Sequence, residues 1–302
     1  MATSRAQLLK ELLPGLNALF GLDYKTYPEQ HKEIYEIESS ERSFEEEVKL
    51  AGFSAAGVKN EGSAVEYDSG QEVWTARFTH ETIARGFSLT EEAIEDNLYD
   101  SLSVRYTKAL TRAMYYTKQT KAAAILNNGF NAAYAVGDGV ALFSTQHGLA
   151  SGGVNSNTAA TPTDLNEAAI EAATIQIQQW TDERGLLIAA NPVKLIVPPS
   201  LQFVATRLLE TQQRVGTADN DINAIKFNGV ISQGYTVNNF LTDPDAWFLK
   251  TDVPNGMKHF VRTKLVTSSD GDFDTGNLRF KARERYSFGV ADPLGMWGSP
   301  GA

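Results

Sequence analysis

Histidine and serine side chains are the first candidates for catalytic or metal-binding chemistry, because the 302-residue chain contains no cysteine. None of the four histidines has the H-x-x-x-H or H-E-x-x-H spacing that presents two metal ligands on one helix face: His31, His80, His147 and His259. Ser144 precedes His147 closely, but a catalytic triad also needs a strained turn and an orienting acid. We therefore interpret Ser144–His147 as a loop of satisfied polar side chains, and we expect no catalytic residue, metal or cofactor.

Two further segments fail as ligand-binding motifs because of their spacing. The glycines between residues 137 and 153 match neither G-x-G-x-x-G nor a Gly-Lys-Ser/Thr phosphate loop, which favours a flexible connector. Asp270–Gly276 has acids at the first, third and fifth positions of a calcium loop. Its glycine comes one place late, and Lys281 occupies the twelfth position, where a calcium loop has glutamate. We predict an acidic hairpin tip at this segment.

Four cations alternate with apolar residues near the end of the chain. The pattern predicts a strand with one apolar and one basic face, and the basic face carries Arg279, Lys281, Arg283 and Arg285. Cations this close repel one another, so an acidic partner is expected. The first candidate is residues 29–47, with eight glutamates against Lys32 and Arg42, in the same subunit or a neighbouring one; nucleic acid is the second. We hypothesise a band of intersubunit salt bridges.

Composition limits the partners of the protein. A net charge of −10 makes tight coating of nucleic acid a poor fit, because neutralising phosphates needs clustered cations, although an acidic wall can still enclose DNA. The absence of cysteine excludes disulfides and thiolate metal sites, and it fits assembly in the cytoplasm. No apolar run approaches the roughly 20 residues of a membrane span, so no membrane partner is expected.

The strongest single element is a long helix predicted over residues 89–129. Ser88 and Glu91 have the spacing of a capping box, and residues 127–129 (Asn-Asn-Gly) form a plausible stop. Apolar residues recur at helical spacing between these ends: Ile94, Leu98, Leu102, Ala109 and Ala113. At about 1.5 Å per residue such a helix extends nearly 60 Å, well beyond the usual three or four turns.

A polar hairpin is predicted just before this helix. Alternating runs at 65–67 and 73–78 flank a turn at Asp68–Gly70. An isolated hairpin with so little apolar material is marginal in water, so it must lean on another surface. Residues 161–250 then alternate helices and short strands, including a buried strand at Val193–Val197, which is typical of a compact α/β unit.

The order of these elements resembles a known family of capsid proteins. The segments that carry the resemblance are 191–210 (NPVKLIVPPSLQFVATRLLE), 240–249 (FLTDPDAWFL) and 283–298 (RERYSFGVADPLGMWG). They are similar to the major capsid proteins of tailed bacteriophages with the Hong Kong 97-type fold, in particular the Mu-type major head protein. The resemblance implies an α+β fold made of an N-terminal arm at 1–47, an E-loop at 48–88, a spine helix at 89–129, a peripheral domain at 130–160 and 251–302, and an axial domain at 161–250.

The same resemblance implies a structural role in the virion. Hexamers and pentamers of the chain are expected to form an icosahedral shell around double-stranded phage DNA, assembled in the bacterial cytoplasm, with each E-loop lying across a neighbour's spine helix. Portal, scaffolding or decoration proteins are further partners, and any scaffold or maturation protease is expected to be a separate protein. The intersubunit contacts that we expect are Glu45, Glu46, Glu47, Lys59, Trp74, Arg77, Arg279, Lys281, Arg283 and Arg285.

Some relatives are crosslinked by a Lys–Asn isopeptide bond. Lys59 lies in the candidate E-loop, but nothing in the sequence identifies a partner Asn or a catalytic Glu, so this chemistry is not carried over. Two other shell or ring proteins remain open as alternatives: an encapsulin-type nanocompartment, and a phage tail or connector subunit. An enzyme built on the 161–250 unit is a third, and it lacks a convergent nucleophile, base and phosphate loop.

Overall fold

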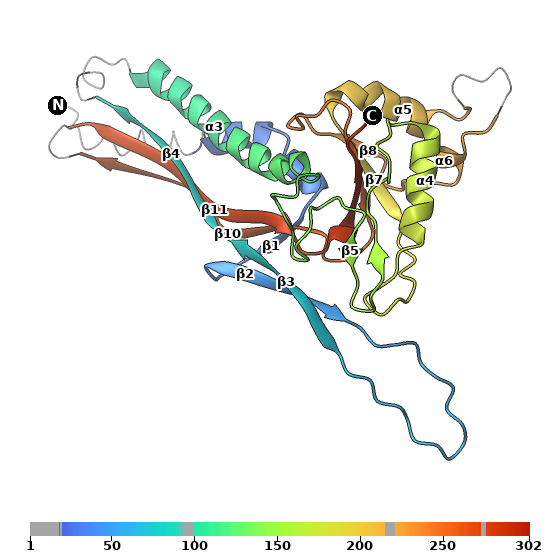
Figure 1. The fold of residues 1–302 in the computed structure, drawn as a ribbon. Coiled ribbons are helices and arrows are strands. Elements are labelled where there is room, and N and C mark those ends of the chain that lie inside the picture. Colours follow the sequence, from blue (N-terminus) through green and yellow to red (C-terminus); the bar gives the residue numbers. More distant parts are fainter. Residues whose placement is uncertain (1–17, 19, 91, 93–98, 215–220, 273–275) are drawn as a thin grey trace.

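A long sheet with one helix along it forms the elongated half of the subunit, and a compact α/β unit forms the other half (Figure 1). The computed structural model describes residues 18, 20–90, 92, 99–214, 221–272 and 276–302. The fold is α+β, as predicted. None of the helices in these ranges combines the length and the apolar character that crossing a bilayer requires.

The long helix is α3, Tyr99–Asn127, and its end agrees with the predicted Asn-Asn-Gly stop. Its predicted start is wrong. Ser88 belongs to strand β4, Glu81–Leu89, where it pairs with Arg279, and Glu91 lies outside the described residues. A strand partner far along the chain therefore takes the residue that a local capping motif would use.

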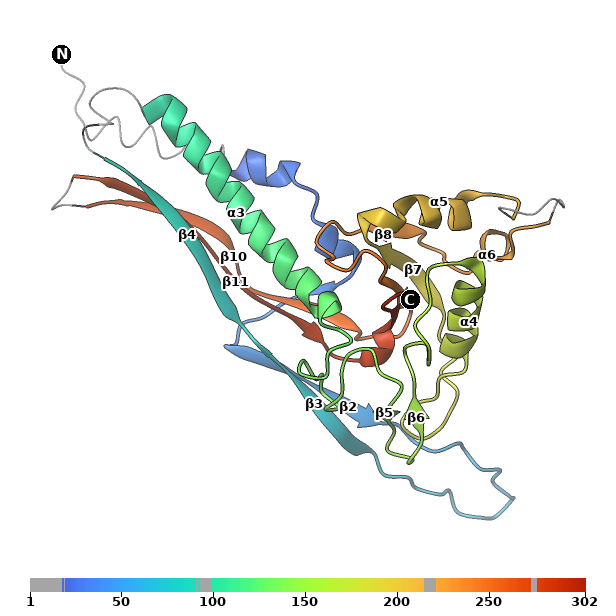
Figure 2. The same ribbon diagram turned by 45° about the horizontal axis from the view of Figure 1, so that its top comes forward.

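The long sheet has the strand order β1-β10-β11-β4. Its strands are β1 (Glu36–Ser39), which runs parallel to its neighbour, then β10 (Met257–Gly271), β11 (Leu278–Val290) and β4. The predicted two-faced strand is β11. Its Phe280 and Ala282 are buried against Leu110 and Met114 of α3 and against Phe20. Among the described residues, no helix covers the opposite face of the sheet (Figures 1 and 2).

A two-stranded hairpin leaves the long sheet because β3, Gln71–Thr79, runs almost directly into β4. The partner of β3 is β2, Phe44–Ala51, so the acids at 45–47 lie in a strand of the hairpin. The predicted turn at Asp68–Gly70 is also wrong. The chain reverses at Asn60–Ser63, where the Ser63 amide donates to the Asn60 carbonyl at 3.2 Å, and residues 52–70 form one extended loop.

The compact unit is built on a sheet of order β12-β9-β7-β8. Its core contains the rings of Trp247 and Trp297, whose centroids lie 4.9 Å apart, together with buried residues of α4 and α5. The bounds are α4 Glu167–Gln178, β7 Pro192–Val197, η2 Pro199–Leu201, α5 Gln202–Glu210, α6 Ala224–Phe227, β8 Tyr235–Val237, β9 Trp247–Thr251, η3 Pro293–Gly295 and β12 Met296–Ser299.

The last strand differs from the sequence-based division of the chain. The resemblance places residues 251–302 together in the peripheral domain, whereas β12 returns to pair with β9 in the compact unit. Between α3 and α4 the described chain forms mostly loops, with a short pair of strands, β5 (His147–Gly148) and β6 (Val154–Asn155). Before β1 lies a short turn of helix, η1 (Gln30–Glu33).

Two glycines, Gly256 and Gly295, let the backbone of η3 approach the start of β10 closely. A Cβ added at Gly295 would lie 2.3 Å from the Cα of Gly256, and neither backbone can give way easily. Gly295→Ala is therefore expected to lower the free energy of unfolding by about 1–3 kcal/mol, the usual cost of overpacking. Gly148→Ala is the control, since a Cβ there has no atom within 4 Å and is expected to change stability by less than about 0.5 kcal/mol. Equal denaturation midpoints for the two variants would contradict the close approach.

Candidate assembly surfaces

The loop at 52–70 is the most exposed part of the described chain. Every residue in it is exposed, and large apolar side chains are among them. Val58 is 95% and Tyr67 96% exposed, and Phe53 and Val65 are also largely exposed. Apolar side chains gathered on one projecting segment are typical of a surface that another protein covers.

The base of the hairpin, in contrast, is fixed to the body of the subunit. Lys49 of β2 forms an ion pair with Asp292, whose carboxylate also accepts from the Leu294 amide at 3.0 Å. Phe78 of β3 lies edge-on to Phe260 with centroids 5.0 Å apart. The ring of Trp74 occupies the space that a side chain at Gly137 would need. The hairpin therefore projects from a base that is packed against the body of the subunit.

Arg184 holds the two legs of the loop together where they leave the strands. Its Nε donates to the Gly52 carbonyl at 3.0 Å, and its Nη2 donates to the Ser69 carbonyl at 2.7 Å. The Asp68 carboxylate lies 3.9 Å from the same guanidinium. The Ser54 amide donates to Asp68 at 2.7 Å, which joins the legs directly. A single arginine from the turn after α4 thus fixes the direction in which the loop projects.

The predicted basic face is present on the uncovered side of β11. Arg279, Lys281 and Arg283 are exposed, and Arg285 is half-buried. Arg279 forms an ion pair with Asp272 at 2.5 Å. The segment that holds Asp272 is the tip between β10 and β11, as predicted for the acidic hairpin tip, although residues 273–275 lie outside the described part.

The acids at 45–47 do not meet these cations within the subunit. Glu45 accepts from Ser40 Oγ at 2.6 Å, Glu46 lies 3.8 Å from Arg77, and Glu47 lies 3.1 Å from Lys258. The intrasubunit form of the predicted salt-bridge band is therefore wrong, because partners closer in the fold take the carboxylates first. Whether these residues contact a neighbouring subunit stays a prediction.

The acids of β1 and β2 pair with Lys258 of β10, which is not one of the predicted cations. Its side chain is 4% exposed and lies between Glu38 and Glu47, at 2.8 and 3.1 Å. Burial alone would lower the pKa of Lys258, but the two carboxylates outweigh it and hold the pKa above its usual value. Two other predicted contact residues lie away from Lys258. The guanidinium carbon of Arg77 lies 3.9 Å from the centroid of the Phe44 ring, and Lys59 is exposed near the tip of the loop.

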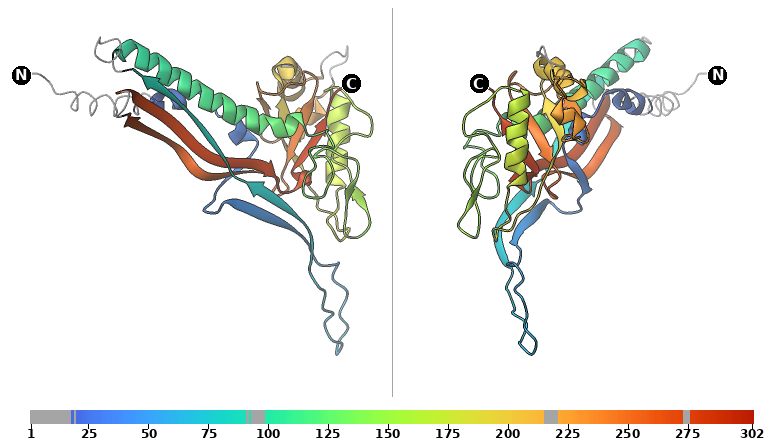
Figure 3. Two further views of the ribbon diagram at one scale, coloured as in Figure 1. Left: turned by 60° about the vertical axis from the view of Figure 1, so that its left-hand side comes forward. Right: turned by 90° about the vertical axis from the view of Figure 1, so that its right-hand side faces the viewer.

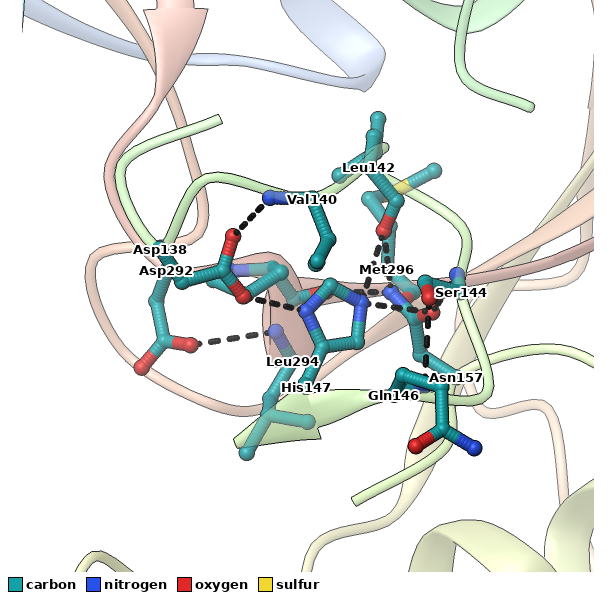
Figure 4. Close-up of polar contacts among 11 residues, drawn as sticks. Asp138, Val140, Leu142, Ser144, Gln146, His147, Asn157, Asp292, Leu294 and Met296 are labelled. Atoms are coloured by element: carbon teal, nitrogen blue, oxygen red, sulfur yellow. Dashed lines mark hydrogen bonds and ion pairs between the residues drawn. The ribbon is translucent and has the colours of Figure 1, made fainter. Parts of the chain in front are cut away.

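The Ser144–His147 segment is a loop of satisfied polar groups, as predicted (Figure 4). His147 Nδ1 lies 2.5 Å from Asp138, and its Nε2 lies 3.2 Å from the Leu142 carbonyl and 3.1 Å from Asn157 Oδ1. Asn157 Nδ2 also donates to the Leu142 and Met296 carbonyls. Both ring nitrogens are occupied, so this histidine organises the loop. Within the described residues, no group of three or more His, Asp or Glu side chains is placed to hold a metal ion.

A buried polar layer beneath α3 was missed from the sequence. Lys118 of α3 lies 2.6 Å from Glu284 of β11, and the glutamate side chain is only 1% exposed. Burial raises the pKa of Glu284, against the opposing charge of Lys118. Glu284 occupies a place where the apolar face of β11 continues, between Ala282 and Tyr286. A lone acid among apolar alternate positions is the signal that a buried cation lies opposite.

Two neutral histidines lie beside this ion pair and join the arm to the sheet. His31 of η1 meets His259 of β10 edge-on at 5.1 Å, and His259 stacks on Phe288 at 4.1 Å. His31 Nδ1 lies 2.8 Å from the Gln119 amide nitrogen of α3. Burial first, and Lys118 next, lower the pKa of His31 to about 4. Burial and then His31 lower the pKa of His259 to about 3.

Acid is therefore expected to destabilise this junction. Between about pH 6.5 and pH 4 an unfolded chain protonates these histidines while the folded one keeps them neutral, so stability falls as the pH falls. Each histidine contributes up to about 1.4 kcal/mol per pH unit over that window. In His259→Phe, denaturant titrations at several pH values are expected to give a shallower decline than the unsubstituted protein. Parallel declines would show that His259 is not neutral and buried.

Several solved structures of capsids and capsid-like particles are similar to this chain in fold. The chain is similar to the virus-like particle from Pyrococcus furiosus, with a TM-score of 0.56 and 12% identity over 96% of this chain and 99% of that one. It is similar to the capsid of an empty GTA particle, with a TM-score of 0.56 and 14% identity over 89% of this chain and 88% of that one. It is also similar to the procapsid of bacteriophage JBD30, with a TM-score of 0.53 and 14% identity over 98% of this chain and 76% of that one. The architecture is therefore that of a Hong Kong 97-type capsid subunit.

The family itself follows from the sequence. The phage capsid protein family matches residues 73–298, and the chain belongs to that family. The resemblance of the sequence to tailed-phage capsid proteins is thereby confirmed. As a member of this family, the protein is a structural, non-enzymatic capsid protein. Among curated protein sequences, none matches the chain significantly.

Proposed function

We propose that the protein is the major capsid protein of a tailed phage, assembling as hexamers and pentamers into an icosahedral shell around double-stranded DNA. The observation that carries this proposal is the loop at 52–70, held at its root by Arg184 and exposed along its whole length. A projection whose direction is fixed and whose apolar residues cover nothing in their own chain fits a contact with a neighbouring subunit.

The proposed parts follow the family. Residues 1–43 are the arm, the hairpin of β2 and β3 with its loop (44–79) is the E-loop, α3 is the spine, 161–250 with β12 is the axial domain, and the remainder is the peripheral domain. A net charge of −10 suits a wall that encloses DNA without binding its sequence. Portal, scaffolding and decoration proteins remain partners in this proposal, and assembly takes place in the bacterial cytoplasm.

Electron microscopy of the purified, overexpressed protein tests this function. Closed icosahedral shells with pentameric vertices are the expected result, and DNA is expected inside particles recovered from phage. Rings or open tubes would instead identify a tail or connector subunit. Small oligomers at concentrations well above micromolar would contradict shell formation altogether.

An encapsulin-type shell is the second candidate. It is favoured by the near-complete mutual coverage, 96% and 99%, with the virus-like particle subunit from Pyrococcus furiosus. The content of the particles separates the two candidates. Shells that copurify with one protein cargo and no DNA would support a nanocompartment, whereas DNA-filled heads would support a phage capsid.

A further inference from the structure

We infer that the outward ridge of α3, formed by Arg105, Lys108 and Arg112, is a contact surface for the phosphate backbone of double-stranded DNA. The inference rests on the proposed function, because the DNA is the content of the proposed shell, and it names the side of the subunit that faces this DNA. The ridge lies on the opposite side of the long sheet from the projecting hairpin (Figures 1 and 3).

The three cations of the ridge share one face of the helix. They occupy positions i, i+3 and i+7 of α3, so they lie on the same side and span about 10 Å at about 1.5 Å per residue. All three are exposed, whereas Leu110 and Met114 of α3 are buried against the sheet. Within the described residues, α3 forms its ion pairs through Lys118 and Lys121, so the ridge cations have no carboxylate partner there.

The ridge is unfavourable for the isolated subunit. Like charges three and four residues apart on a helix repel one another. Residues 101–127 contain five cations and no Asp or Glu, although the chain has 37 acids in 302 residues, and the nearest preceding acid in the sequence is Asp100. An anionic partner from outside the subunit removes this repulsion.

A fourth cation extends the basic surface from the helix to the edge of the sheet. Arg85 of β4 lies opposite Ala282, which is buried beneath α3, so Arg85 is on the α3 side of the sheet. The residue is exposed. Along β4 it lies between Phe87, whose ring centroid is 5.6 Å from that of Tyr106, and Glu81, which forms an ion pair with α3. The basic surface therefore includes both α3 and the strand beside it.

The chemistry of the ridge favours DNA over a protein partner. Protein interfaces depend on aromatic and other apolar side chains that become fully desolvated. The exposed tyrosines of α3 already pack within the subunit, Tyr106 on Phe87 and Tyr116 on Phe240, with ring centroids 5.6 and 5.9 Å apart. Charge is what remains available on this surface. Cations along a helix fit a phosphate backbone, which is contacted without reading the bases.

The strength of the contact depends on salt. Three cations that neutralise three phosphates give a salt exponent of about 2.7, so raising the salt from about 50 to about 150 mM is expected to weaken the contact roughly twentyfold. The net charge of −10 means that the rest of the subunit repels DNA. The packaged duplex is therefore held at one basic surface of each subunit, and the protein does not coat it.

Protection of a DNA duplex of about 30 base pairs by shells of the full-length protein tests the contact. Shells are assembled with the duplex at about 50 mM salt and treated with nuclease, and the protected DNA per subunit is measured. Arg105→Gln with Lys108→Gln and Arg112→Gln is expected to lower this amount by at least about fivefold. Arg105→Lys with Arg112→Lys keeps the charge and is expected to retain the protected DNA.

The matched control makes the same change in net charge away from the ridge. It neutralises three other exposed cations, with Arg42→Gln, Arg207→Gln and Lys264→Gln. The control is expected to keep most of the protected DNA. Equal losses in the two triple variants would show that only net charge matters, and full retention in the ridge variant would show that the ridge makes no contact. Either result would overturn the inference.

Shells assembled without DNA separate this inference from the proposed function. The ridge variant is expected to form empty shells in normal yield. If it failed to do so while the control assembled, the ridge would be a contact for a neighbouring subunit, and the inference alone would be overturned. If the unsubstituted protein formed no shells, the proposed function would be overturned and the inference with it.

A cryo-electron microscopy map of the DNA-filled particle gives a readout that needs no substitution. The outermost layer of duplex is expected to lie beside α3 and Arg85. A shell in which α3 faces the outside would overturn the inference and leave the proposed function intact.

Discussion

Lys118→Ala is expected to lower the free energy of unfolding of the subunit by about 3–5 kcal/mol, the usual consequence of removing one partner from a buried ion pair. The substitution leaves the Glu284 carboxylate, 1% exposed, without its cation at 2.6 Å. Burial already raises the pKa of Glu284, so the unpaired group is expected to become protonated. Denaturant unfolding followed by circular dichroism measures the loss.

The control replaces both partners with apolar residues of similar size, Lys118→Met with Glu284→Leu. Buried ion pairs replaced in this way often cost nothing and can gain stability, because no charge remains to be desolvated. The double variant is therefore expected to recover most of the loss. If Lys118→Ala and the double variant were equally unstable, the cost would come from packing and the ion pair would not be responsible.

Removing the loop is expected to abolish shell assembly while leaving the subunit folded. The deletion takes out residues 54–68 and closes the hairpin with an Asn-Gly turn, the favoured two-residue connection. Residues 52–70 are exposed throughout, so little core is lost, and the thermal midpoint is expected to change by only a few degrees. Sedimentation velocity is expected to show small species only.

Arg184→Ala provides a graded comparison for the deletion. It keeps the loop but removes the hydrogen bonds to Gly52 and Ser69 that hold its root. Shell yield is expected to fall to an intermediate level, because the loop must then be ordered during assembly. Normal shells from the deletion variant would exclude the loop as an assembly contact.

The sequence predicted those elements whose signals are local. The alternation of β11 gave both faces correctly, because the period of a strand alone determines which residues share a face. The end of α3 at Asn127 follows from its stop residues. The start of α3 does not, because Ser88 is taken by a strand partner that lies almost two hundred residues away in the chain.

The hairpin shows why the rest could not be predicted. The run of glutamates at 45–47 does not indicate a strand. The pairing of residues 44–51 with β3 depends on Lys49, Lys258 and Asp292, which come together only in the fold. The same limit applies to β12, whose pairing with β9 joins distant segments. Of the predicted contact residues, Arg279, Lys281, Arg283 and Lys59 are exposed and Arg285 is half-buried, whereas Glu45 and Glu47 have partners inside the subunit.

The central claim is that copies of this chain form a closed shell in which each hairpin contacts a neighbour, and a cryo-electron microscopy reconstruction of the assembled particle tests it most directly. The expected map has icosahedral symmetry, with density for residues 52–70 lying against the adjacent subunit. A closed shell in which that loop extends into solvent, or rings and tubes in place of a shell, would contradict the account.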